Sequence, residues 1–97
     1  MYAATRFLMR RPTAIFLNAA RLDYDKALNF THLSKLTDLT LNNVDSISDP
    51  DKIAELVNAS NAEIVITKEM EVPSSALEKF SSNVKLMCEA GDIITFQ

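Results

Sequence analysis

The chain contains four short apolar segments, at residues 13–17, 39–44, 62–66 and 84–88. Three of them are almost continuous apolar runs, which are typical of strands buried on both faces of a parallel sheet. The segment at 39–44 instead alternates between apolar and polar residues, which predicts a strand near the sheet edge with one wetter face. The segment at 62–66 is rich in β-branched residues, so we place it at the centre of the sheet.

A helix is predicted between the second and third apolar segments. Asp49 can accept hydrogen bonds from the free N–H groups of a helix start, and Pro50 is tolerated at the first helical position. Residues at i, i+3 and i+4 then form an apolar stripe, made of Ile53, Leu56 and Val57. We therefore expect a helix over about 50–59, which ends at a group of polar residues, namely Asn58, Ser60 and Asn61.

Two shorter helices are expected elsewhere. Residues 22–37 predict an irregular loop followed by a short helix, because Leu33 and Leu36 have helical spacing. Ser75 and Glu78 have the spacing of a capping box, which predicts a helix over about 75–81. This alternation of strands and helices predicts a single α/β domain with a mostly parallel sheet and right-handed crossovers.

The first 12 residues are basic and contain Arg6, Arg10 and Arg11 without any acidic residue. Such a start is similar to an organellar transit peptide. Because the segment is short and poor in serine, we favour its interpretation as a flexible N-terminal extension before the first strand. We therefore expect a cytoplasmic protein, with organellar import as the alternative.

The remainder of the chain is acidic, which limits the classes of partner. The formal net charge is −3, and all 13 acidic residues follow residue 22. Nucleic-acid binding relies on clustered Lys and Arg, which this acidic body lacks. No apolar run approaches the roughly 20 residues that span a bilayer. We expect neither a nucleic acid nor a membrane as partner.

Cys, His and Gly each occur only once, and each of these counts excludes a class of site. A lone Cys88 excludes an internal disulfide, and with a lone His32 neither a structural zinc site nor a His-rich metal site is expected. A dinucleotide-binding fingerprint requires three glycines and a Walker-type loop requires two, whereas the chain has only Gly91. A glycine-rich nucleotide site is therefore excluded.

Individual reactive side chains have ordinary explanations. Acidic pairs two residues apart do not share a helix face, so we interpret them as caps, turns and solvated positions: Asp23 and Asp25, Asp49 and Asp51, Glu69 and Glu71. We expect His32 to be solvated on a short surface helix. Cys88 lies in an apolar strand, where a thiol usually acts as a small hydrophobic group.

Position then becomes the main functional signal. Ligands of open parallel sheets bind outside the carboxyl ends of the strands, here residues 18–19, 67–69 and 89–91. Lys68 is the only cation in these segments, so it is the side chain that could attract a small carboxylate. The alternative is a solvated loop lysine.

Three stretches resemble the D-isomer-specific 2-hydroxyacid dehydrogenases. Residues 14–18 (AIFLN), 62–68 (AEIVITK) and 84–91 (VKLMCEAG) are similar to the first strand, the AEIVIT-K strand and the VKLICxAG strand of that family, with the glycerate dehydrogenase or hydroxypyruvate reductase branch most alike. The likeness extends over residues 13–91, which would form part of the family's catalytic, substrate-binding domain. It implies a flavodoxin-like parallel sheet, order 2-1-3-4-5 filled as far as 2-1-3-4, with helices on both faces.

The resemblance also implies a substrate site. In the family, backbone N–H groups of the loop at the Ala90 and Gly91 positions bind the carboxylate of a small 2-hydroxy or 2-oxo acid, and the loop at Lys68 borders the same cleft. Fixed backbone dipoles suit such an anion. We carry these substrate-binding roles to Lys68, Ala90 and Gly91, and no catalytic, cofactor-binding or metal-binding role to any residue.

The sequence departs from the family after Gly91. Relatives continue with a T-G-Y-N-N-[IV]-D stretch, whereas residues 92–97 form a divergent tail, DIITFQ. The family's catalytic Arg, Glu and His have no counterparts, and its NAD(P) is not expected to bind these residues. We therefore expect a truncated fragment of an NAD(P)-dependent oxidoreductase, inactive alone. The alternative is a non-catalytic α/β interaction module, which self-associates or docks on a full-length relative through an exposed sheet edge and the apolar tail.

Overall fold

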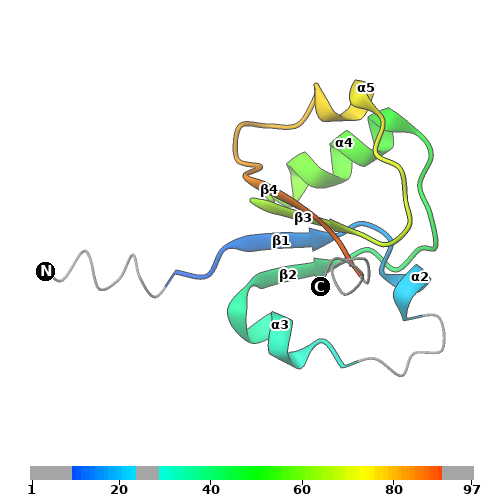
Figure 1. Cartoon of the computed structure of the whole chain (residues 1–97). Helices are drawn as coiled ribbons and strands as arrows, with labels where there is room; N and C mark the ends of the chain where they lie inside the picture. The colour runs from blue at the N-terminus through cyan, green and yellow to red at the C-terminus, as the bar shows by residue number, and fades with distance from the viewer. Residues whose placement is uncertain (1–9, 24–28, 91–97) are drawn as a thin grey trace, which may run out of the picture.

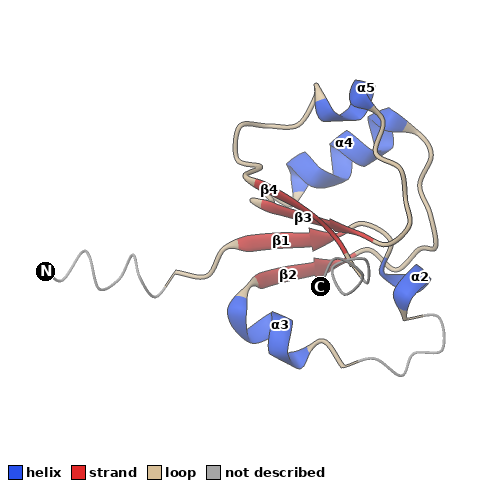
Figure 2. Cartoon of the chain, in the orientation of Figure 1, coloured by secondary structure: helices blue, strands red, loops and turns tan. Residues whose placement is uncertain are grey.

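A parallel sheet with helices on both faces forms the centre of the molecule (Figures 1 and 2). A computed structural model describes residues 10–23 and 29–90. Its elements are, in chain order, β1 (Thr13–Phe16), α2 (Ala19–Leu22), α3 (Thr31–Leu36), β2 (Asp38–Leu41), α4 (Pro50–Ala59), β3 (Ile64–Thr67), α5 (Ser74–Leu77) and β4 (Leu86–Glu89). Helices α4 and α5 lie on one side of the sheet, and α2 and α3 lie on the other.

The strand order is β2-β1-β3-β4, and every described pairing is parallel. Both the order and the orientation confirm the predicted α/β fold. β1 pairs with β2 from Thr13 opposite Asp38, and it pairs with β3 from Ala14 opposite Ile64. β3 lies at the centre beside β1, and β2 lies at an edge, as the two hydrophobic patterns predict.

All four strands begin or end at residues other than those predicted, and local hydrogen bonds explain the end of β2 and the start of β4. β2 ends at Leu41 because the Asn42 carbonyl accepts from Ala19 N–H, 3.0 Å away, in the loop after β1. The chain therefore leaves the sheet before residue 44. β4 begins at Leu86, since the preceding Val84 N–H donates to Ser81 O in a turn.

The start and end of α4 follow from its sequence. The Asp49 carboxylate accepts from Asp51 N–H at 3.0 Å, so the predicted cap is confirmed. At the other end, Asn61 has a positive φ of 57°. Its N–H donates to Asn58 O and the Ala62 N–H donates to Val57 O, which is the double hydrogen bond of a Schellman motif. Asn tolerates this left-handed backbone better than most residues do.

The predicted capping box at Ser75 and Glu78 is wrong. α5 covers Ser74–Leu77 instead of 75–81, its N-cap is Pro73, and no side chain caps it. Ser75 is thus the second residue inside the helix, so its hydroxyl does not hold the N-cap position that a capping box requires. Pro73 determined the start because its backbone is already restricted to a conformation that suits a helix entry.

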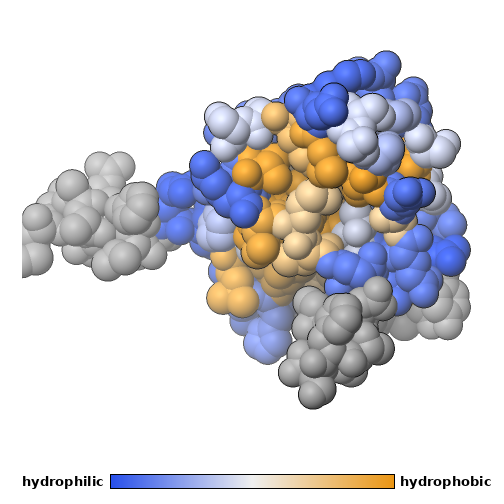
Figure 3. All heavy atoms as spheres, turned by 45° about the horizontal axis from the view of Figure 1, so that its top comes forward, coloured by the Kyte–Doolittle hydropathy of each residue, from blue (hydrophilic) through white to orange (hydrophobic). Residues whose placement is uncertain are grey.

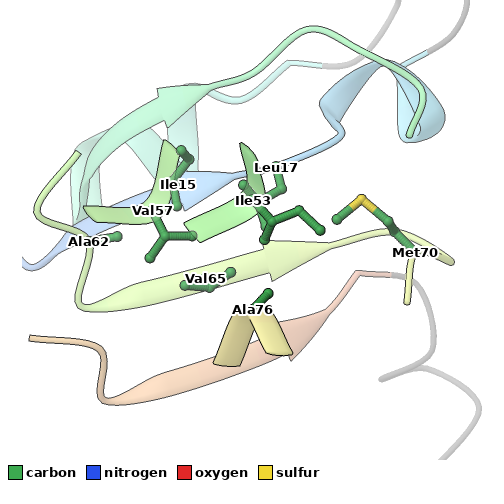
Figure 4. Packing of buried hydrophobic residues seen from close by; sticks show 8 residues of the cluster. All are labelled: Ile15, Leu17, Ile53, Val57, Ala62, Val65, Met70 and Ala76. Carbon is green, nitrogen blue, oxygen red and sulfur yellow. The ribbon is translucent and has the colours of Figure 1, made fainter. Parts of the chain in front are cut away.

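Alternate residues of β1 and the following Leu17 divide the core into two clusters. Ile15 and Leu17 pack on the α4 side, where side chains from β1, β3, α4 and α5 point toward one another (Figure 4). Ala14 and Phe16 pack on the opposite side, and the Phe16 ring meets the Phe30 ring edge to face at 6.1 Å. The predicted burial of β1 on both faces is therefore confirmed.

The β4 side of the sheet remains open. Figure 3 shows an apolar area on the face that carries β4 and α5, surrounded by polar residues. Its exposed apolar side chains include Leu77, Leu86 and Met87. In residues 10–23 and 29–90, no helix is long and apolar enough to cross a membrane.

Candidate functional site

The carboxyl ends of β1, β3 and β4 meet at one end of the sheet. Because the strands are parallel, Asn18, Lys68 and Glu89 follow or end neighbouring strands at the same level. These positions belong to the three segments that the sequence analysis selected. We call this end of the sheet, with its three segments, the carboxyl-end site.

Asn18 holds the site together and is fully buried. Its Nδ2 donates to Lys68 O at 2.8 Å and to Asp45 O at 2.9 Å, while its Oδ1 accepts from Lys68 N–H at 2.9 Å. The side chain therefore satisfies three backbone groups from two loops. Sequence reasoning placed Asn18 at the right edge but did not predict this role, because its partners are distant in sequence.

The Glu89 carboxylate occupies a position that suits an anion. The Glu69 N–H donates to both of its oxygens, at 3.0 and 2.9 Å, and the Thr67 hydroxyl lies 3.4 Å from Oε1. Glu69 adopts a left-handed backbone with φ of 50°, which costs a non-glycine residue about 1 kcal/mol. The loop after β3 thus directs a backbone donor toward negative charge, and that charge comes from the chain itself.

The residues predicted to bind substrate differ in their exposure and in their hydrogen bonds. Lys68 is largely covered, with 20% of its side chain exposed, and its Nζ lies 4.0 Å from Glu69 Oε2. The Ala90 N–H donates to Thr67 O at 2.7 Å, so this donor is used within the sheet. Gly91 lies outside the described residues.

A second cation reaches the site from α2. Arg21 lies 3.3 Å from a Glu69 oxygen and 3.4 Å from an Asp45 oxygen, and all three side chains are substantially exposed. Each pair contributes little to stability because water screens it. The sequence analysis missed Arg21 and Asp45, and the only available signal was that Arg21 follows β1 by about one helical turn.

An open groove of about 290 Å³ runs beside the site, between the loop after β3 and β4. Its lining residues are Thr67, Met70, Val72, Met87, Cys88 and Glu89. One wall is apolar and the other ends at a carboxylate, a combination that suits a small organic molecule with one polar end. In the part of the chain that the structure describes, every buried side-chain N or O has a hydrogen-bond partner.

Of the two other candidate groups, His32 lies away from this site and Cys88 lines the groove beside it. His32 is exposed on α3, which leads into the amino end of β2, as the sequence analysis expected of a solvated histidine. Cys88 is half-buried and packs against the cluster on the α2 side. Among the residues that are described, no group of three or more His, Cys, Asp or Glu could hold a metal ion.

Comparisons of the chain with family models, curated proteins and solved structures gave no match. The function must therefore be argued from the residues and their geometry.

Proposed function

We propose that residues 13–91 are the front part of the substrate-binding domain of a D-2-hydroxyacid dehydrogenase, an NAD(P)-dependent oxidoreductase that acts on the CH–OH group of D-2-hydroxy acids. The main support is that the three stretches with family likeness form neighbouring strands, whose carboxyl ends meet at one end of the sheet. Asn18 of the first stretch and Lys68 of the second are joined by two hydrogen bonds, and Ala90 of the third bonds to Thr67.

The role proposed for these residues is binding. Hydride transfer needs a nicotinamide held against the substrate beside a proton donor, and the 97 residues contain no glycine-rich site for that cofactor. NAD(P) belongs to the rest of the family's architecture, and we expect no turnover from this chain by itself. The ligand we propose is a small 2-oxo or 2-hydroxy acid, with its carboxylate near Lys68.

Charge at the carboxyl-end site determines how strongly such an acid binds. Lys68 attracts a carboxylate, whereas Glu89 repels it and also holds the Glu69 N–H that a ligand could use. Neutralising Lys68 should therefore lower the affinity for the acid, and neutralising Glu89 should raise it. Opposite changes in affinity in the two variants would support a carboxylate site between these residues.

The test is a ¹⁵N NMR titration with glyoxylate. We expect saturable shifts in the backbone amides of Lys68, Glu69 and Ala90, with glycolaldehyde, which lacks a carboxylate, as the comparison ligand. Lys68→Met should weaken binding several-fold, and Glu89→Gln should strengthen it several-fold, because each changes one unit of charge beside the ligand. Lys35→Met, at an exposed position on α3 and before the amino end of β2, is the matched control and should leave the affinity unchanged.

Two results would contradict this assignment. Shifts that do not saturate, or that are the same in the Lys68→Met and Lys35→Met variants, would exclude a carboxylate site at Lys68. NADH oxidation with glyoxylate or hydroxypyruvate by the 97-residue chain would show that it is not a binding domain alone.

The proposal places the protein in the cytoplasm, with import directed by the basic first 12 residues as the alternative. A fluorescent reporter carrying residues 1–12 should remain diffuse in cells. Accumulation of that reporter in an organelle would favour import.

A further inference from the structure

β4 has an unpaired edge. It pairs with β3 on one side, and no strand of the described residues pairs with its other side. Leu86 is 52% exposed and Met87 is 41% exposed, which is unusual for neighbouring apolar residues in a strand. The apolar area in Figure 3 includes this edge. Exposed strand edges of this kind are templates for pairing with another chain.

The direction of the backbone groups along β4 follows from its bonds to β3. The Leu86 N–H donates to Glu63 O at 3.1 Å, and the Ala90 N–H donates to Thr67 O at 2.7 Å. Backbone groups alternate in direction along a strand, so those of Met87 and Glu89 point away from β3. This edge therefore presents outward backbone groups at Met87 and Glu89, whereas the Lys85 N–H at the start of the strand donates to Glu63 O at 2.7 Å.

The charges along β4 are complementary to the same strand running in the opposite direction. Lys85 precedes the strand and Glu89 ends it, with Met87 midway between them. If two copies pair antiparallel about Met87, each Lys85 lies opposite Glu89 of the other copy. Opposite charges at directly facing positions stabilise a pair of strands, whereas like charges destabilise it.

We propose that β4 pairs with β4 of a second copy of this chain, antiparallel and about a two-fold axis at Met87. The two Met87 residues then exchange both backbone hydrogen bonds, and each Glu89 N–H donates to Lys85 O across the axis, while the Lys85 N–H keeps its bond to Glu63 O. The register uses the backbone groups that point outward and matches the two charges at once. A self-complementary edge favours a closed dimer, since the same surface serves both partners.

The side chains also suit this register. Met87 lies opposite Val65 in the sheet and shares its face, which is the α4 side, together with Lys85 and Glu89. Leu86 and Cys88 lie on the other face and would face each other across the axis. Both exposed apolar residues of β4 are covered in the dimer. Glu89 can accept from Lys85 while it keeps the Glu69 N–H, because a carboxylate has about four acceptor positions.

Sedimentation equilibrium of the full chain measures the association. We expect a monomer–dimer equilibrium, which Met87→Pro abolishes by removing an outward N–H without loss of a hydrogen bond to β3. Leu41→Pro is the matched control, because it changes the equivalent outward position on the opposite edge strand and should leave the dimer intact. Lys85→Glu should weaken association by about tenfold, since it places like charges opposite each other twice.

Disulfide trapping tests the register without relying on proline. Residues 86 and 88 form a non-hydrogen-bonded pair in this register, with Cα atoms about 4.5 Å apart, within the range of a disulfide. Oxidised glutathione should convert the Leu86→Cys variant to a covalent dimer through Cys88 of the second copy. The unchanged chain and a Leu41→Cys variant should remain monomeric on a non-reducing gel.

Three outcomes would overturn the proposal. The first is a chain that remains monomeric at millimolar concentration. The second is an assembly that grows beyond a dimer, which would indicate that β4 adds to β2 of the next copy. The third is a Leu86→Cys variant that is dimeric in the centrifuge but gives no covalent dimer. None of these measurements depends on the ligand of the carboxyl-end site, so the two proposals can fail separately.

Discussion

Asn18 and Lys68 exchange two hydrogen bonds across the carboxyl ends of β1 and β3, because Nδ2 donates to Lys68 O while Oδ1 accepts from Lys68 N–H. The amide reproduces the pairing of a strand neighbour at a point where the chain has already left the sheet. It therefore fixes the loop that carries Lys68 and Glu69. The geometry of the proposed carboxylate site depends on this one buried side chain.

Asn18→Ala should destabilise the protein by roughly 2–4 kcal/mol, because it removes the fully buried amide that pairs with backbone groups of Lys68 and Asp45. Urea unfolding followed by far-UV circular dichroism measures this free energy. Asn58→Ala is the control, since Asn58 also makes two hydrogen bonds, at 2.9 and 2.8 Å, but at an exposed position. Equal losses in the two variants would show that burial is not what makes Asn18 important.

Acid should weaken the fold through Glu63. The Arg10 guanidinium donates to this carboxylate at 3.0 and 3.2 Å and the Thr13 N–H donates at 3.1 Å, which lowers the pKa of Glu63 below its ordinary value. A lowered pKa means that the stabilisation is complete above the ordinary carboxyl pKa and is lost as pH falls through the folded-state value. The difference in unfolding free energy between the wild-type chain and Glu63→Gln should therefore shrink as pH falls from 7 to 3.

The Arg10→Gln variant provides the matching control for this pH dependence. Its removal of the largest cause of the shift should flatten the acid limb of the stability curve in the same way as Glu63→Gln. If the stability curve is flat at acid pH in one variant but like that of the wild-type chain in the other, the Arg10–Glu63 pair is not the source of the pH dependence.

The left-handed residue after α4 predicts opposite effects of two small side chains. Asn61→Ala should destabilise the protein by about 1 kcal/mol, because a Cβ without a local hydrogen-bonding group is unfavourable at φ of 57°. Asn61→Gly should be neutral or stabilising, since glycine adopts this conformation freely. Thermal unfolding of the two variants measures their order of stability. An alanine variant that is more stable than the glycine variant would contradict the Schellman geometry.

The N-cap of α4 predicts a loss of stability when Asp49 is replaced. Asp49→Ala should cost about 1 kcal/mol, because the Asp51 N–H loses its acceptor. Asp49→Ser should recover most of this loss, as serine also accepts at a helix start. Urea midpoints of the three chains are the measurement. Failure of serine to rescue would indicate that the negative charge, and not the hydrogen bond, supports the helix.

The sequence predicted those features whose causes lie close together in the chain. The α4 helix was correct because its cap, its proline and its stripe lie within ten residues and agree with one another. The continuous apolar runs also predicted the parallel strands and the burial of β1. The capping box failed because two signals, Pro73 and Ser75, competed for the same start, and spacing alone does not decide between them.

The candidate site was predictable as a place but not as a set of contacts. The parallel topology brings the strand ends together, so Lys68 could be located from position. The contact of Glu89 with the Glu69 N–H depends on a left-handed residue that has no glycine to signal it. The Arg21 pairs join segments more than twenty residues apart, and no local pattern indicates them.

The central strand pair has a consequence for how the molecule forms. Ala14 of β1 meets Ile64 of β3, and the Thr13–Glu63 hydrogen bond beside this pair closes a separation of 50 residues. Long-range closure of this kind slows folding relative to local contacts. During synthesis β1 has no central neighbour until the ribosome has released the chain beyond residue 66. Of the four strands, β1 therefore remains longest without its central partner, and its apolar residues are open to aggregation during that interval.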